Sequence, residues 1–322
     1  MGKSYLYANG VVSALSTKLI TKDCFNRMIE AKSNIEALNI LQETAFGSGL
    51  TIDSPFEIEE LTTFETKKLL NFIKEESPSE ELINLFLLPY DYSNIAGVCK
   101  AILLNQDEID FVEVEGLYEI SKIKDLISSK RFEAFNNPFI ENCLKDFQEL
   151  SVKNLNMGYE IDLIFKTYLY KNLLDMSKKS KIINEIVNIY ISIENISIAM
   201  RSDNVFIMQQ QLLKGGFLTE DNLLKVFNKD NSVLSEIKNY VVKKFVEIAL
   251  MDDNKEAFVS FEILKNNFVF SMLLPGKYDN DSLTPFALYC FEREAQIKNV
   301  RLIMSYQNNN LSKEIKKRFL EW

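Results

Sequence analysis

The chain has 322 residues, of which 47% are hydrophobic, and a formal net charge of −9 at pH 7, which disfavours nucleic acid and anionic lipid as partners. The length predicts two or three domains, and ten glycines and six prolines are few for the turns of a many-stranded sheet, so we expect an all-α fold. The absence of histidine excludes histidine-dependent triads and the usual proton shuttle at neutral pH.

The sequence predicts a series of helices in the first third of the chain. Apolar residues recurring at every fourth position predict the first helix from Ser4 to Ile20. Capping signatures predict that further helices start at Thr21, Ser33, Thr62 and Ser77. Pro89 is expected to break the next apolar run, so that a new helix begins near residue 91 and continues to about residue 104.

The rest of the chain continues the helical pattern. Thr219 is expected to start a helix, and the last long helix is predicted from Thr284 to Ser305, with a Thr284 cap and Pro285 in the first turn. An amphipathic helix is expected to close the chain, over 311–322. Further helices are expected over 120–127, 132–147, 159–176, 181–201, 232–251 and 255–273.

A short pattern occurs three times in these helices. Asn94, Asn195 and Asn299 are each followed by a β-branched residue and then by small or apolar residues three and four positions further on, and they are spaced by 101 and 104 residues. Leucines follow the first two asparagines by 23 residues, each just after a glycine. We interpret the chain as three diverged copies of one helical unit, forming domains over 1–110, 111–212 and 213–322.

The three asparagines allow two interpretations. Each borders an apolar stripe, and a buried amide in that position usually bonds the backbone of a neighbouring segment, which makes Asn94, Asn195 and Asn299 structural repeat positions. The alternative is that they bind a ligand. We expect the structural role.

No other group of residues makes a persuasive active site. The cluster Asp252-Asp253-Asn-Lys-Glu256 resembles the aspartate-rich magnesium motif of all-α isoprenoid enzymes, but a second such motif is missing, and a solvated helix junction explains it. Four scattered cysteines without CxxC spacing indicate buried, reduced thiols. We therefore expect no catalytic residue, no metal site and no cofactor. No uninterrupted apolar run is long enough to span a bilayer, and no signal peptide is recognisable, which indicates an intracellular protein.

Two stretches resemble a known family. The segment Arg293-Glu-Ala-Gln-Ile-Lys-Asn-Val-Arg301 and the opening Tyr5-Leu-Tyr-Ala-Asn-Gly-Val-Val-Ser-Ala-Leu15 are similar to the C subunit of V-type and A-type rotary ATPases, which is called d in eukaryotes. The all-α character and the length agree. Gln296 departs from the family pattern, because relatives commonly carry an acidic residue there.

The resemblance implies a funnel or socket of three similar helical domains around a pseudo-threefold axis. It further implies a non-catalytic rotor subunit, peripheral on the cytoplasmic face of the membrane, whose partners are central-stalk subunits of the D and F type and the membrane rotor ring. Such a protein would couple ATP hydrolysis or synthesis to proton or sodium translocation, with no membrane span of its own. The alternatives are a soluble all-α scaffold or adaptor unrelated to ATPases and an enzyme of the isoprenoid-synthase type.

Overall fold

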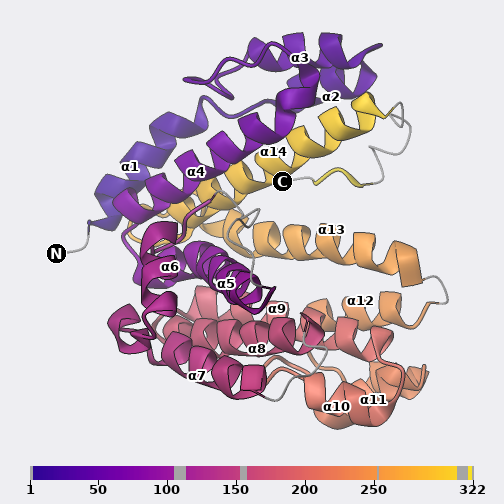
Figure 1. Cartoon of the computed structure of the whole chain (residues 1–322). Coiled ribbons are helices and arrows are strands. Elements are labelled where there is room, and N and C mark those ends of the chain that lie inside the picture. The colour runs from indigo at the N-terminus through magenta and orange to yellow at the C-terminus, as the bar shows by residue number, and fades with distance from the viewer. Residues whose placement is uncertain (1–2, 105–113, 153–157, 252–253, 310–317, 321–322) are drawn as a thin grey trace. The chain divides into compact units, whose positions relative to one another are not determined.

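The computed structural model describes residues 3–104, 114–152, 158–251, 254–309 and 318–320. Throughout these residues the regular elements are helices and none is a strand (Figure 1), which confirms the expected all-α class. Two sequence predictions lie partly outside the described residues. They are the amphipathic closing helix and the aspartate-rich cluster that begins at Asp252.

The contacts within the chain divide it into two compact units. Unit 1 consists of Met1–Glu80 together with Lys255–Trp322, and unit 2 is the continuous stretch Glu81–Asn254. Unit 1 thus joins the two ends of the sequence. The division into three domains over 1–110, 111–212 and 213–322 stays a prediction.

Unit 1 is built around its last helix, α14 (Thr284–Asn308), which packs against α1, α3 and α4. The ring of the buried Phe286 on α14 stacks on Phe72 of α4, with centroids 5.4 Å apart. Its other elements are α1 (Tyr5–Ser16), α2 (Lys22–Glu30), α3 (Asn34–Gln42), η1 (Pro55–Glu57), α4 (Ile58–Glu76), α13 (Asn254–Leu273, from Lys255 on) and η5 (Leu274–Gly276).

Unit 2 is built around α9 (Lys181–Arg201), which packs against α8, α11 and α12. The predicted break before α9 is confirmed as the short 3₁₀ turn η3 (Ser177–Lys179) that follows α8 (Gly158–Met176). The remaining elements are α5 (Glu80–Leu104), α6 (Ile120–Ser128), η2 (Phe132–Phe135), α7 (Pro138–Val152), α10 (Val205–Gln211), α11 (Glu220–Phe227), η4 (Asn231–Ser235) and α12 (Tyr240–Ala249).

Several predicted helix starts are confirmed by their hydrogen bonds. The side chains of Thr21 and Ser33 accept from the backbone N–H groups three residues on, and so cap α2 and α3. Thr219 forms a complete capping box with Asn222 at the start of α11. These starts are predictable because the cap and its partner lie within one turn.

Other predicted boundaries are wrong. Thr62 does not start a helix but lies inside α4, because a capping box between Ser54 and Glu57 starts the helical segment earlier. Thr284 makes no capping bond, since it is already the first residue of α14. The helix predicted over 232–251 is split into η4 and α12, with Asn239 capping α12.

Pro89 does not break its helix. It lies inside α5, which runs without interruption from Glu80 to Leu104. A proline removes one backbone hydrogen bond and crowds the preceding turn. The helix continues because its apolar residues on both sides of the proline, including Leu88 and Tyr92, are buried.

Two helical segments of the described chain are long and apolar enough to cross a bilayer, judged by length and composition alone. They are Lys181–Arg201 and Ala257–Gly276, and in their most apolar stretches 61% and 33% of the residues are buried in the protein. Core helices of soluble proteins meet the same criterion, so these two segments are weak evidence for a membrane span.

Candidate functional site

The three repeated asparagines are buried and hold the backbone of a later segment. Asn195 and Asn299 each form a pair of hydrogen bonds with one leucine: the amide nitrogen donates to the carbonyl of Leu213 or Leu320 (2.9 and 2.8 Å), and the amide oxygen accepts from the N–H of the same leucine (2.8 and 2.9 Å). Asn94 donates to the carbonyl of Val114 at 2.9 Å. Each asparagine thus ties its long helix to the backbone of a segment 18 to 21 residues further along the chain.

A second polar residue stands three positions before each asparagine. The Asp91 carboxylate accepts from the N–H groups of Leu117 and Tyr118 at 3.0 and 3.1 Å. Ser192 Oγ accepts from the N–H of Phe217 at 2.8 Å. In each case the residue that is held lies just before a short helix, α6 or α11.

The third such residue, Gln296, holds a segment near the beginning of the chain. Its amide accepts from the N–H of Ile20 and donates to the Ile20 carbonyl, both at 3.1 Å, and Ile20 lies just before the short helix α2. A carboxylate could accept but not donate here. This explains why an amide suits the position where the family pattern is acidic. Asp91 and Ser192 are absent from the sequence predictions, and Gln296 appears there only as a departure from the family pattern. Their constant offset from the asparagines is a signal that could have found all three.

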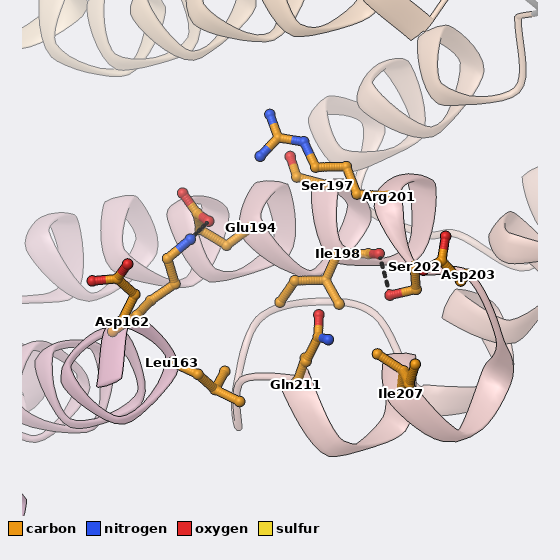
Figure 2. A pocket seen from close by; sticks show the side chains of 11 residues that line it. Asp162, Leu163, Glu194, Ser197, Ile198, Arg201, Ser202, Asp203, Ile207 and Gln211 are labelled. Atoms are coloured by element: carbon orange, nitrogen blue, oxygen red, sulfur yellow. Dashed lines mark hydrogen bonds and ion pairs between the residues drawn. The ribbon is translucent and has the colours of Figure 1, made fainter. Parts of the chain in front are cut away.

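A groove in unit 2 is lined by α8, α9 and the segment around α10 (Figure 2). Its volume is about 410 Å³, and Lys166 and Glu194 pair across it with 2.7 Å between ammonium and carboxylate. Arg201, Asp203 and Asp162 also line it. The groove therefore carries charges of both signs on partly exposed side chains.

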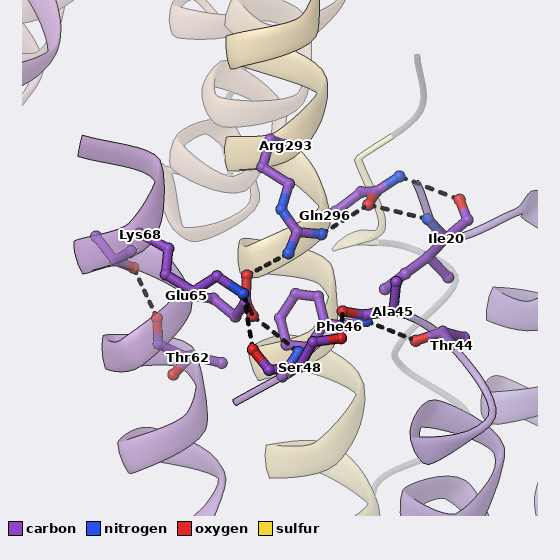
Figure 3. Close-up of polar contacts among 12 residues, drawn as sticks. Ile20, Thr44, Ala45, Phe46, Ser48, Thr62, Glu65, Lys68, Arg293 and Gln296 are labelled. Carbon is purple, nitrogen blue, oxygen red and sulfur yellow. Dashed lines mark hydrogen bonds and ion pairs between the residues drawn. The ribbon is translucent and has the colours of Figure 1, made fainter. Parts of the chain in front are cut away.

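Unit 1 contains a buried ionic cluster at the contact between α4 and α14 (Figure 3). The Glu65 carboxylate, whose side chain is only 1% exposed, pairs with Arg293 and also with Lys68 at 3.1 Å. It accepts a third bond, at 2.8 Å, from the N–H of Gly47, which has a φ of 79°. Buried charges are stable in proteins when they are paired and hydrogen-bonded in this way.

Glycine is the residue type that fits position 47 in this cluster. The positive φ of Gly47 disfavours other residues, and an added Cβ would lie 2.7 Å from Leu61 Cδ1. The guanidinium of Arg293 lies over the Phe46 ring, 4.8 Å from its centroid. The cluster therefore fastens the loop around residues 45–49 to two helices.

The expected buried thiols are confirmed. Cys24, Cys99, Cys143 and Cys290 are all buried and free, and burial raises the pKa of each thiol. Thiols in such surroundings are protonated and unreactive. Across the described residues no group of three or more cysteine, aspartate or glutamate side chains is placed to hold a metal ion.

These features define an all-α protein whose buried polar groups hold helices and loops in place. The sequence model of the ATP synthase (C/AC39) subunit family matches residues 8–319. The chain therefore belongs to the ATP synthase (C/AC39) subunit family.

Relatives with curated names agree with this membership. The chain is 20% identical to the C subunit of the A-type ATP synthase of Thermococcus kodakarensis, over 98% of this chain and 90% of that protein. It is 20% identical to the C subunit of the V-type sodium ATPase of Enterococcus hirae, over 96% of both chains. With the C subunit of the A-type ATP synthase of Desulfurococcus it shares 26% identity over 96% of this chain and 88% of the relative. The family membership decides against an unrelated scaffold and against an isoprenoid enzyme.

Proposed function

We propose that this chain is a non-catalytic rotor subunit of a V/A-type ATPase, which links the central stalk to the membrane rotor ring. In this role it couples ATP hydrolysis or synthesis to the translocation of protons or sodium ions. Its partners are central-stalk subunits of the D and F type and the rotor ring, and it sits peripherally on the cytoplasmic face of the membrane. The observation that carries the proposal is the family match over residues 8–319.

The packing of the chain supports a mechanical role. A part that transmits torque must resist shear, and close-packed helices are stiff. In unit 1 the Glu65–Arg293 pair and the Gln296–Ile20 bonds tie α14 to segments more than 200 residues earlier in the sequence, which are separated from it by 228 and 276 residues. Such long-range bonds make unit 1 rigid, and a mechanical role needs this rigidity rather than a catalytic group.

The repeated polar pairs also support the proposed three-part architecture. Each pair lies on a long helix, α5, α9 or α14, and its first member, Asp91, Ser192 or Gln296, holds the segment before a short helix. This common pattern is the reason to propose three similar domains that surround one axis.

The test is to reconstitute the ATPase complex in vesicles with and without this chain and to measure ATP hydrolysis and ion pumping in the same preparation. Without it, hydrolysis by the catalytic subunits should continue while ATP-driven ion uptake into the vesicles is lost, and adding the chain back should restore uptake. Undiminished pumping without the chain contradicts the proposal. Purification of the native complex should recover the chain together with stalk and ring subunits, whereas an unrelated adaptor would recover none.

A further inference from the structure

Unit 1 contains a cavity of about 600 Å³ whose walls come from α1, the start of α2, the segment 274–285 and α14. Both apolar and polar side chains line the cavity. Val12, Leu274 and Leu288 contribute apolar surface, while Asn9 and Glu292 contribute polar groups from the two long helices. None of Glu65, Lys68 and Arg293 lines this cavity.

Glu292 is the unusual member of this lining. Three carboxylates are buried among the described residues: Glu65, Asp91 and Glu292. The first two are paired or hydrogen-bonded, as described above. Glu292 is 9% exposed and has neither a hydrogen bond nor an ion pair with any described residue. Because a buried charge without a partner is costly, this arrangement indicates a missing partner.

Asn9 adds a second unused acceptor to the wall. It is 2% exposed, and its amide nitrogen donates to the carbonyls of Asn280 and Ser282, both at 3.0 Å. These two bonds fix the orientation of the amide, because the reverse orientation would place its oxygen against two other oxygens. Its Oδ1 is enclosed and has no hydrogen-bond partner among the described residues. The amide oxygen of Asn9 therefore adds negative electrostatic potential to the cavity that Glu292 also lines.

Two lysines, Lys22 and Lys277, line the cavity. The ammonium group of Lys277 lies over the Tyr278 ring, 5.9 Å from its centroid, and forms no ion pair with Glu292. Lys22 is exposed to solvent and forms no ion pair with Glu292. Burial raises the pKa of the Glu292 carboxyl, and the charge of Lys277 offsets only part of that rise. Neither lysine provides the close counter-charge that a buried carboxylate needs.

We propose that this cavity binds an organic cation, a primary ammonium or guanidinium group that donates hydrogen bonds to Glu292 while its alkyl stem packs on Val12 and Leu288. A carboxylate with free lone pairs accepts from such groups with charge-assisted bonds. A lysine or arginine side chain combines this head with an apolar stem. The net charge of −9 attracts cations to the chain. The cation is either a small amine or the side chain of a neighbouring protein.

Binding is tested on the purified full chain by calorimetric titration with butylammonium and butylguanidinium chlorides at constant ionic strength. Butanol is the neutral control of similar shape. Saturable binding of the cations but not of butanol is expected. Glu292→Gln should weaken that binding by about tenfold or more, which corresponds to the loss of a charge-assisted hydrogen bond. Glu294→Gln, on the same helix but paired with Lys298 at 3.3 Å, should bind as the natural chain does.

Equal binding of the cations to the natural chain and to Glu292→Gln overturns the proposal, and so does equal binding of butanol. Thermal unfolding checks that the variants fold. Glu292→Gln should unfold at a higher temperature than the natural chain, since it removes an unpaired buried charge. The variant Lys277→Met should leave cation binding intact. If Lys277→Met instead lowers the unfolding temperature and Glu292→Gln lowers it as well, Lys277 is the partner of Glu292 and the proposal is wrong.

A final experiment distinguishes a small amine from a side chain of a neighbouring protein as the source of the cation. Of the experiments on this cavity, only this one depends on the proposed function. Butylguanidinium is titrated into the assembled ATPase complex. If a partner's lysine or arginine fills the cavity, binding seen with the free chain is lost in the complex, whereas an unchanged affinity indicates a small amine. Failure of the chain to assemble would contradict the proposed function and leave the titration of the free chain valid.

Discussion

Glu65 on α4 and Arg293 on α14 form a buried ion pair between residues that are 228 positions apart in the sequence. Their side chains are 1% and 13% exposed. This ion pair is one of several contacts that join the N-terminal and C-terminal portions of unit 1. It also determines the loop before α4, because the same carboxylate binds the backbone of Gly47.

Replacing Glu65 with glutamine should lower the free energy of unfolding by about 3 kcal/mol, because it leaves Arg293 without its counter-charge in a buried place. Urea denaturation measures the change. The control is Glu43→Gln, which breaks the exposed pair with Arg27 at 2.9 Å and should cost less than about 1 kcal/mol. Equal losses for the two variants would show that the buried pair has no special role.

Replacing Asn299 with alanine should cost about 2 kcal/mol, because the N–H and carbonyl of Leu320 would lose their partner in a buried place. Amide hydrogen exchange should at the same time become faster at Leu320. Asn309→Ala is the control, since among the described residues that exposed side chain bonds only the carbonyl of Ser305. Unchanged protection at Leu320 in Asn299→Ala would contradict this role of the asparagine.

The carboxyls of Glu262 and Glu292 should give opposite dependences of stability on pH. Burial alone would raise the pKa of Glu262, but Lys298 and Lys265 lower it to about 2 from a normal value of 4.5. The stabilisation from Glu262 is therefore present above pH 4.5 and is lost as the pH falls toward 2. Because the Glu262 side chain is 44% exposed, salt should reduce this effect.

Burial raises the pKa of the Glu292 carboxyl above its normal value of 4.5 in the folded protein. Between these two pKa values, Glu292 therefore holds its proton more tightly in the folded than in the unfolded protein. The contribution of Glu292 to the free energy of unfolding should therefore fall as the pH rises from 4.5 to the pKa of Glu292 in the folded protein. Unfolding by urea at a series of pH values measures both effects. Glu262→Gln should remove the loss in acid, and Glu292→Gln should remove the loss at higher pH. Parallel curves for the natural chain and both variants would contradict the assignments.

The fragment 81–254 should fold alone, since it contains all of unit 2, whereas 1–80 should not fold without 255–322. Circular dichroism and cooperative thermal unfolding measure this. The control fragment 111–212 corresponds to a predicted third of the chain. It lacks α11 and α12, which pack on α9, and should therefore unfold less cooperatively than 81–254. The reverse result would favour the predicted thirds over the two units.

Much of the local structure can be predicted from the sequence. The helical class and the caps at Thr21 and Ser33 depend on residues within one or two turns. Side chains that recur at helical spacing and caps that bond three residues ahead leave a pattern that can be read directly.

The same local reasoning fails where distant segments compete. Capping rules make Glu65 the partner of a cap at Thr62, but it is buried against Arg293. The rules for proline make Pro89 a helix end, but packing on both sides keeps α5 continuous. Periodicity and capping alone show neither outcome, because each depends on what lies opposite in the folded chain.

The sequence by itself determined the helical class, the family and the repeated asparagine pattern. Only the tertiary structure decided which backbone each polar side chain holds, that the two ends of the chain form one unit, and that Glu292 lines a cavity without a partner among the described residues. The physical reason is that helix formation and capping depend on neighbours in the sequence, whereas burial and pairing of charges depend on segments that meet only when the chain has folded.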